Sequence, residues 1–165
     1  MKHTISVLVE NHSGVLSRIS GLFSRRGFNI ESLAVGPTQD PAISRITIIA
    51  DGNEHPVEQI EKQLNKLIEV IKVKTLSKDE CLARELMIVK IACTAEKRSE
   101  IMTIAEITGA KVMDIALTTM TLELCDTYAH LKRFEEIIAP YNILEMVRTG
   151  TIAIQKGAEV IAAKK

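Results

Sequence analysis

Apolar positions along the chain follow two periods, one close to 2 residues and one close to 3.6. Short apolar or alternating runs, which are typical of β-strands, occupy residues 5–9, 29–35, 44–50, 70–73, 85–93, 111–117, 120–125 and 143–147. Segments with apolar residues at helical spacing occupy 15–26, 54–67, 95–108 and 129–139. The order strand, helix, strand, strand, helix, strand therefore occurs twice, which is the split βαβ pattern. The sequence predicts an α+β protein of two ferredoxin-like βαββαβ domains in tandem.

The division between the halves is predicted in the most polar stretch near the middle, residues 77–80. This places one domain at 4–78 and a second at 79–157. Whether the last strand continues past Gly150 over 151–154 stays open. Residues 158–165 are expected to form a flexible tail, as terminal residues often do.

The loop before the first helix has the composition of a binding site for a small polar molecule. It consists of residues 11–14, and the helix it opens leaves backbone N–H groups without partners and carries a partial positive charge. Gly14 would let a ligand approach the backbone, and the side-chain amides of Asn11 and Asn29 can both donate and accept. Together these groups suit a free amino acid. The alternative is purely structural: Ser13 or Asn11 caps the helix and Gly14 makes the turn.

These residues also carry a resemblance to a known family. The first-half motif is Asn11-x-x-Gly14-x-Leu16, followed by Gly21-Leu22-Phe23-Ser24-x-Arg26-Gly27-Phe28-Asn29-Ile30-Glu31-Ser32-Leu33. It resembles an ACT domain, the amino-acid-sensing βαββαβ module. The run through Thr38, with 60–67 and 84–90, is similar to the small regulatory subunits of acetohydroxyacid synthase, also called acetolactate synthase. The resemblance is most specific over residues 4–90.

The resemblance implies a function. It implies a subunit that binds the catalytic (large) subunit, raises its activity and makes it sensitive to feedback by a branched-chain amino acid, usually valine. The implied role is in valine, isoleucine and leucine biosynthesis. The ACT halves would pair into a homodimer, and 79–157 would activate the partner. The expected effector-binding residues are Asn11, Ser13, Gly14, Val15, Leu16, Asn29 and Ile30. Thiamine diphosphate, FAD and magnesium are expected in the catalytic subunit and none of them in this chain.

Composition narrows the other classes of function. Lys plus Arg equals Asp plus Glu, at 21 each, and there is no Trp, which argues against a nucleic-acid-binding surface. No apolar run reaches the roughly 18 residues of a membrane span, and no signal peptide is expected. The three scattered cysteines, Cys81, Cys93 and Cys125, indicate reduced thiols and a cytoplasmic protein. They share no metal-ligand spacing with the histidines.

Catalytic chemistry is not expected in this chain. The serines of the first helix have no histidine in register to activate them, and the acidic residues follow no fixed spacing. Two alternatives remain: a free-standing ACT sensor that regulates a different enzyme, and an enzyme that acts on amino acids. His12, inside the candidate loop, is either a pH-sensitive element of the site or a solvent-facing residue.

The second half repeats the fold but not the candidate chemistry. Residues 94–98 replace the Asn-x-x-Gly loop, and Lys111 stands where Asn29 stands in the first half. The sequence therefore predicts a division of labour, with the effector site in the first half alone.

Overall fold

The computed structural model describes residues 2–51 and 54–162 and divides them into two compact units. The elements of the first repeat are β1 (Lys2–Glu10), α1 (Val15–Arg25), β2 (Ile30–Pro37), β3 (Ile43–Asp51), α2 (Glu54–Leu64) and β4 (Val70–Leu76). Those of the second are β5 (Cys81–Ala92), α3 (Arg98–Thr108), β6 (Lys111–Ile115), β7 (Thr119–Asp126), α4 (Tyr128–Ile138) and β8 (Ile143–Arg148). A 3-10 turn (Ala139–Tyr141) precedes β8, and a short strand, β9 (Ile152–Gln155), follows it.

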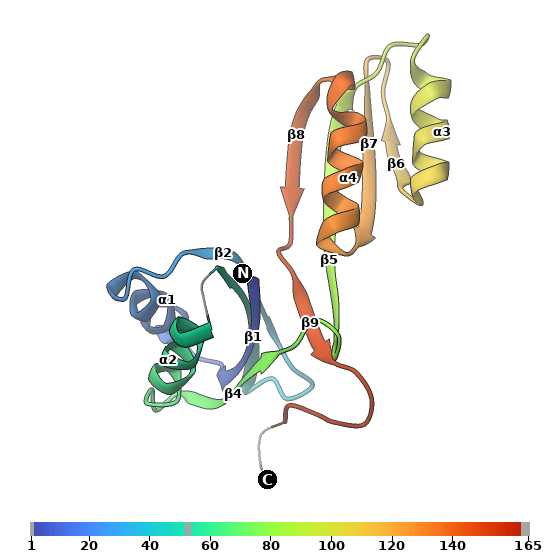
Figure 1. Cartoon of the computed structure of the whole chain (residues 1–165). Helices are drawn as coiled ribbons and strands as arrows, with labels where there is room; N and C mark the ends of the chain where they lie inside the picture. The colour runs from blue at the N-terminus through green and yellow to red at the C-terminus, as the bar shows by residue number, and fades with distance from the viewer. Residues whose placement is uncertain (1, 52–53, 163–165) are drawn as a thin grey trace. The chain divides into compact units, whose positions relative to one another are not determined.

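The first unit contains an antiparallel sheet in the order β2-β3-β1-β4, with α1 and α2 together on one side of it (Figure 1). Alternate residues of β1 and β3 meet the helices, because successive side chains of a strand point to opposite faces. The buried core between sheet and helices contains Ile5, Val7, Val9, Val15, Ile19, Leu22, Phe23, Ile46, Ile48, Ile60 and Leu64. The helical face predicted for residues 15–26 is the face that α1 buries.

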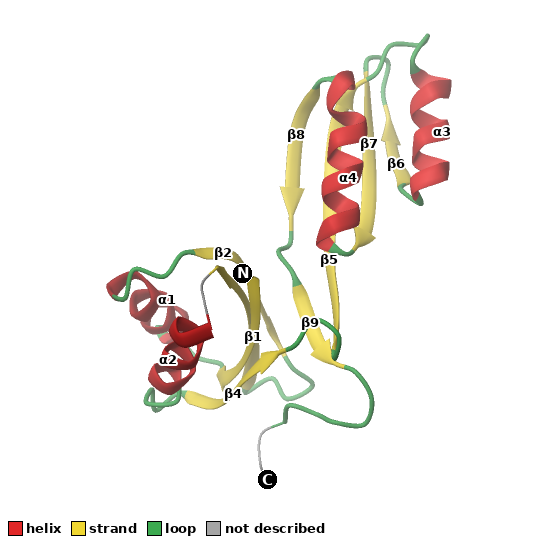
Figure 2. Cartoon of the chain, in the orientation of Figure 1, coloured by secondary structure: helices red, strands yellow, loops and turns green. Residues whose placement is uncertain are grey.

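The second unit repeats this arrangement, with the sheet order β6-β7-β5-β8 and both helices on one face (Figure 2). Its core contains Met87, Val89, Ile91, Ile101, Met120, Leu122, Leu124, Leu131, Phe134 and Ile138. Gly109, at φ 76°, ends α3 in the left-handed conformation expected of a stop glycine. The prediction of two ferredoxin-like domains in tandem is confirmed.

The boundaries of the compact units differ from those predicted. The first unit comprises Met1–Ala83 together with Thr151–Lys165, and the second comprises Arg84–Gly150. The predicted limits at 78 and 157 follow the repeated order of elements, whereas the compact units group residues 151–165 with the first unit. The segment after Gly150 does form a strand, β9, but it pairs with β5, whose residues 81–83 belong to the first unit.

The returning segment, residues 151–162, packs on the first unit. Ala153 and Ile161 are buried at 3% and 5% exposure in a cluster with Leu8 and Leu76. The carbonyl of Ile161 accepts a hydrogen bond of 2.9 Å from the Arg45 guanidinium. Ile161 thus lies among apolar neighbours within the 158–165 segment that was expected to be a flexible tail. Residues 163–165 lie outside the described residues.

Candidate functional site

The loop between β1 and α1 is fixed by hydrogen bonds to two other segments. The backbone N–H of Asn11 donates to the Ala42 carbonyl at 2.8 Å, and its side-chain Nδ2 donates to the Pro41 carbonyl at 2.8 Å. The Glu10 N–H donates to the Glu69 carbonyl at 2.9 Å. Asn11 thus uses one amide proton on the β2–β3 loop, and among the described residues nothing donates to its side-chain oxygen.

Helix α1 begins without a side-chain cap. Gly14 is its N-cap, at φ 89° and ψ −17°, and the first turn contains no acidic residue. The helical hydrogen bonds start with Arg18 N–H to the Gly14 carbonyl at 3.1 Å. Within the described residues no side-chain hydrogen bond of Asn11 or Ser13 reaches the first turn, so the structural alternative for these two residues does not hold. The first-turn N–H groups of α1 can therefore donate to a bound anion.

Two of the predicted residues around this turn have different surroundings. The side chain of Val15 is 4% exposed and belongs to the core, so only its backbone is available to a ligand. Leu16 is 42% exposed, and Ser13 is exposed as well. A ligand at this turn would meet backbone donors, the Gly14 backbone and the apolar Leu16 side chain.

The structure does not bring Asn29 and Ile30 together with the other five predicted residues within one chain. Ile30 pairs with Ala50, which pairs with His3, whereas the loop follows Glu10 at the far end of β1. At about 3.3 Å per residue the two ends of β1 lie roughly 20–25 Å apart. Asn29 is exposed there. One chain thus carries two separate halves of the predicted site.

Two side-chain contacts of the loop region were not anticipated from the sequence. Arg18, one turn into α1, forms an ion pair with Glu69, whose side chain is only 10% exposed. His12 contacts Glu10 at 3.0 Å between Nε2 and Oε2, and its Nδ1 lies 3.1 Å from the Ser13 carbonyl oxygen. Residues 18 and 69 are far apart in sequence, so no local pattern signals their pairing.

The corresponding turn of the second unit already contains an anion. Glu100 lies in the first turn of α3, with its carboxylate 3.1 Å from Lys97 Nζ. A hydrogen bond from Tyr141, and then the one from Lys97, lower the pKa of Glu100. The first turn of α3 therefore carries a carboxylate of the protein itself, whereas no acidic residue stands in the first turn of α1.

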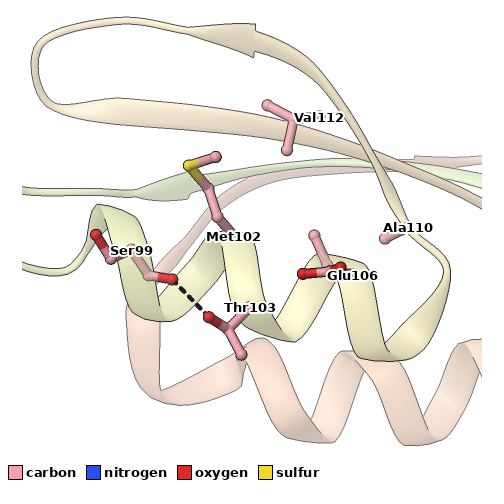
Figure 3. A pocket seen from close by; sticks show the side chains of 7 residues that line it. Ser99, Met102, Thr103, Glu106, Ala110 and Val112 are labelled. Carbon is pink, nitrogen blue, oxygen red and sulfur yellow. Dashed lines mark hydrogen bonds between the residues drawn. The ribbon is translucent and has the colours of Figure 1, made fainter.

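The second unit instead has a shallow apolar groove of about 460 Å³ between α3 and β6. Met102 of α3 and Val112 of β6 extend toward each other across it, and Thr103 donates to the Ser99 carbonyl at 3.0 Å on the outer side of the helix (Figure 3). Strand β6 is exposed along its whole length at the edge of the sheet. The large apolar side chains exposed on α3, β6 and the turn after it are Met102, Ile107, Val112, Met113, Ile115 and Leu117.

Comparison with known proteins decides the family. The profile described as AHAS small subunit-like ACT domain matches residues 5–72, and that of the small subunit of acetolactate synthase matches 84–157. The acetolactate synthase small subunit of Mycolicibacterium smegmatis is 43% identical, over 99% of this chain and 96% of that protein. The chain belongs to the acetolactate synthase small-subunit family.

Other members of this family agree over the full length. The small subunit of Haemophilus influenzae is 43% identical over 98% of this chain and 99% of that protein. The crystal structure of the small subunit from Thermotoga maritima superposes with a TM-score of 0.90 at 32% identity, covering 96% of this chain and 99% of that one. Membership supports a regulatory, non-catalytic role.

Residues 2–51 and 54–162 contain neither a candidate metal site nor a candidate membrane-spanning helix. No group of three or more His, Cys, Asp or Glu side chains there has the arrangement of a metal site. None of the helices described is long and apolar enough to cross a membrane.

Proposed function

We propose that this chain binds the catalytic subunit of acetolactate synthase, raises its activity and confers feedback inhibition by a branched-chain amino acid, with valine as the first candidate. The observation that carries the effector proposal is the contrast between the two helix N-termini. Neither helix has a side-chain cap, but the first turn of α1 contains no acidic residue whereas that of α3 contains Glu100. An effector carboxylate at Gly14 would receive hydrogen bonds from the first-turn N–H groups and interact with the positive end of α1.

The separation of Asn29 from the loop supports a site between two copies. Strand β2 is an edge of its sheet, and edge strands expose unpaired backbone groups. If β2 pairs antiparallel with β2 of a second copy about its middle, Ile30 of one comes opposite Pro37 of the other. Pro37 leads into the β2–β3 loop that holds Asn11. Asn29 of one copy would then complete the loop site of the other, in a homodimer formed through the ACT sheets.

The second unit supplies the surface for the catalytic subunit in this proposal. The exposed apolar side chains around the α3–β6 groove support it, because contiguous apolar surface on a soluble protein commonly marks an interaction site. The catalytic subunit would hold thiamine diphosphate, FAD and magnesium, and the complex would work in the cytoplasm. The small subunit alone would form no acetolactate.

The test is reconstitution with the catalytic subunit and assay of acetolactate formation from pyruvate at increasing valine. We expect Asn29→Ala to leave activation intact and to raise the valine concentration for half inhibition by roughly 5- to 100-fold. This corresponds to about 1–3 kcal/mol for an unpaired polar group. Asn65→Ala, at the end of α2 in the same unit, is the matched control. Unchanged inhibition of the Asn29→Ala complex would place the effector elsewhere. Failure of the wild-type chain to raise the activity of the catalytic subunit would contradict the proposal that this subunit is its partner.

A further inference from the structure

A second depression in the first unit lies between its two helices and is separate from the candidate effector site. Its volume is about 290 Å³, at the lower limit of ligand pockets and suited to a metabolite. It is lined by Leu22 and Arg26 at the end of α1, by Phe28, and by Gln59, Ile60 and Gln63 of α2. Helix α1 is 11 residues long, so its ends lie about 16 Å apart. The depression and the Gly14 turn lie at opposite ends of that helix.

The floor of the depression is apolar and held in place by the core. Leu22 is 7% exposed and Ile60 is 1% exposed. The Phe28 ring packs against Phe23 edge to face, with centroids 6.4 Å apart and an interplanar angle of 71°. Phe23 is itself buried. The floor therefore offers apolar contact to an aliphatic chain, chiefly through the half-buried ring of Phe28.

The rim is polar, and its hydrogen-bonding groups are unused. Gln59 and Gln63 are four residues apart, so they lie on one face of α2. For Arg26, Gln59 and Gln63 no side-chain hydrogen bond or ion pair is found among the described residues. Arg26 and Gln59 are exposed and Gln63 is half-buried, so all three can turn to a ligand in the depression in place of water. The guanidinium presents five N–H donors in a planar fork that matches a carboxylate.

The charge of the lining selects the ligand class. The six lining residues include one cation and no acid, so a ligand ammonium would have no carboxylate to pair with. An organic anion without an amino group fits better than a zwitterionic amino acid. We propose that this depression binds a small aliphatic monocarboxylate, with the carboxylate on Arg26 and the two glutamine amides and the carbon chain on Leu22, Phe28 and Ile60.

The experiment titrates the full-length protein with 3-methylbutanoate and follows backbone amide NMR signals. We expect saturable shifts centred on Phe28, Gln59 and Gln63. Arg26→Gln should raise the dissociation constant about tenfold or more, because it removes the charge-assisted pair. Arg25→Gln makes the same change of charge one residue earlier, outside the lining, and should leave the constant within about twofold.

A second variant and a second probe complete the test. Gln63→Glu is nearly isosteric and places a negative charge on the rim, so it should abolish binding even if Arg26→Gln proves unstable. Inorganic phosphate lacks the aliphatic chain and should bind much more weakly than 3-methylbutanoate. The proposal is overturned by the absence of saturation, by equal affinities of wild type and Arg26→Gln, by equal binding of phosphate, or by shifts centred on residues 11–16. Shifts centred on residues 11–16 would place the carboxylate at the candidate effector turn instead, whereas the other outcomes leave valine inhibition of the reconstituted synthase as a separate test.

Discussion

The left-handed backbone conformation of Gly14 determines which substitutions there can test effector binding. Gly14→Asp would place a carboxylate where the effector carboxylate is expected, so like-charge repulsion should block binding. The structure places Gly14 at φ 89°, a region that L side chains rarely adopt. The strain there is about 1–2 kcal/mol and exceeds the ~0.3–1 kcal/mol that an acid contributes in a first turn. Gly14→Asp should therefore be destabilised, and loss of inhibition in this variant alone would be ambiguous.

Gly14, the N-cap of α1, and Gly21, inside the helix, form a matched pair for measuring this strain. An added Cβ meets no atom within 4 Å at either Gly14 or Gly21, so only backbone conformation distinguishes them. Gly14→Ala should lower the free energy of unfolding by about 1–2 kcal/mol. Gly21→Ala, inside the helix, should raise it by about 0.4–1 kcal/mol. Urea denaturation of both variants measures this, and changes of the same sign would contradict the left-handed conformation at Gly14.

A carboxylate in the second unit makes stability depend on pH. Asp126 Oδ2 lies 2.6 Å from His130 Nδ1, and Asp126 Oδ1 accepts from the Thr127 N–H at 2.6 Å. The His130 hydrogen bond, and then the Thr127 one, lower the pKa of Asp126. Because the folded pKa lies below the unfolded one, the ionised carboxylate stabilises the fold above the unfolded pKa. That stabilisation is lost as the pH falls through the folded value.

The corresponding variant is Asp126→Asn. Its deficit in unfolding free energy relative to wild type should be present at pH 5 and should shrink below about pH 4, as the Asp126 carboxylate of wild type is protonated. Urea unfolding at a series of pH values gives both curves. Asp114→Asn, at an exposed position of β6, is the control and should show little deficit at any pH. A deficit of Asp126→Asn that persists unchanged to pH 2 would exclude this origin.

At the scale of elements, periodicity predicted the helices and strands but not the pairing of segments that are far apart in sequence. The helical period of residues 15–26 and the order of helices and strands along the chain were predicted correctly, because each depends on neighbours in sequence. The place of β9 was not, since its partner in β5 is some seventy residues earlier. For the same reason the sequence pointed to the loop at 11–14 but gave no sign that Asn29 lies at the far end of β1.

The returning segment also gives a prediction at this scale. Ile161 is buried at 5% exposure beside Leu8 and Leu76, whereas its neighbour Val160 is 74% exposed. Ile161→Ala should lower the stability of the first unit by about 2 kcal/mol, the lower end of the range for buried isoleucines, because the cluster is small. Val160→Ala should change it by less than about 0.5 kcal/mol. Amide hydrogen exchange in β1 reports on this unit specifically. Equal protection in both variants would show that the segment does not pack there.

At the scale of the whole molecule, the first unit is discontinuous in sequence, which decides what a functional fragment must contain. Its sheet carries residues 151–162 through the Ala153 and Ile161 contacts and through Lys74, whose Nζ lies 3.0 Å from Glu159 Oε2. A fragment of residues 1–83 lacks this cover and leaves apolar surface and edge strands exposed. A domain of this size is only marginally stable, because it buries a small fraction of its surface.

We therefore expect residues 1–83 alone to unfold readily or aggregate. The same residues joined by a short Gly/Ser linker to 151–165 should give a cooperative unfolding transition. The joined fragment should still dimerise and bind valine, since β2, the Gly14 turn and Asn29 are all present. It should not activate the catalytic subunit, because it lacks α3 and β6. Sedimentation, calorimetric titration with valine and the reconstituted acetolactate assay measure the three properties. A fragment of 1–83 as stable as the joined one would mean that the returning segment is dispensable, and full activation by the joined fragment would show that the catalytic subunit contacts the first unit instead.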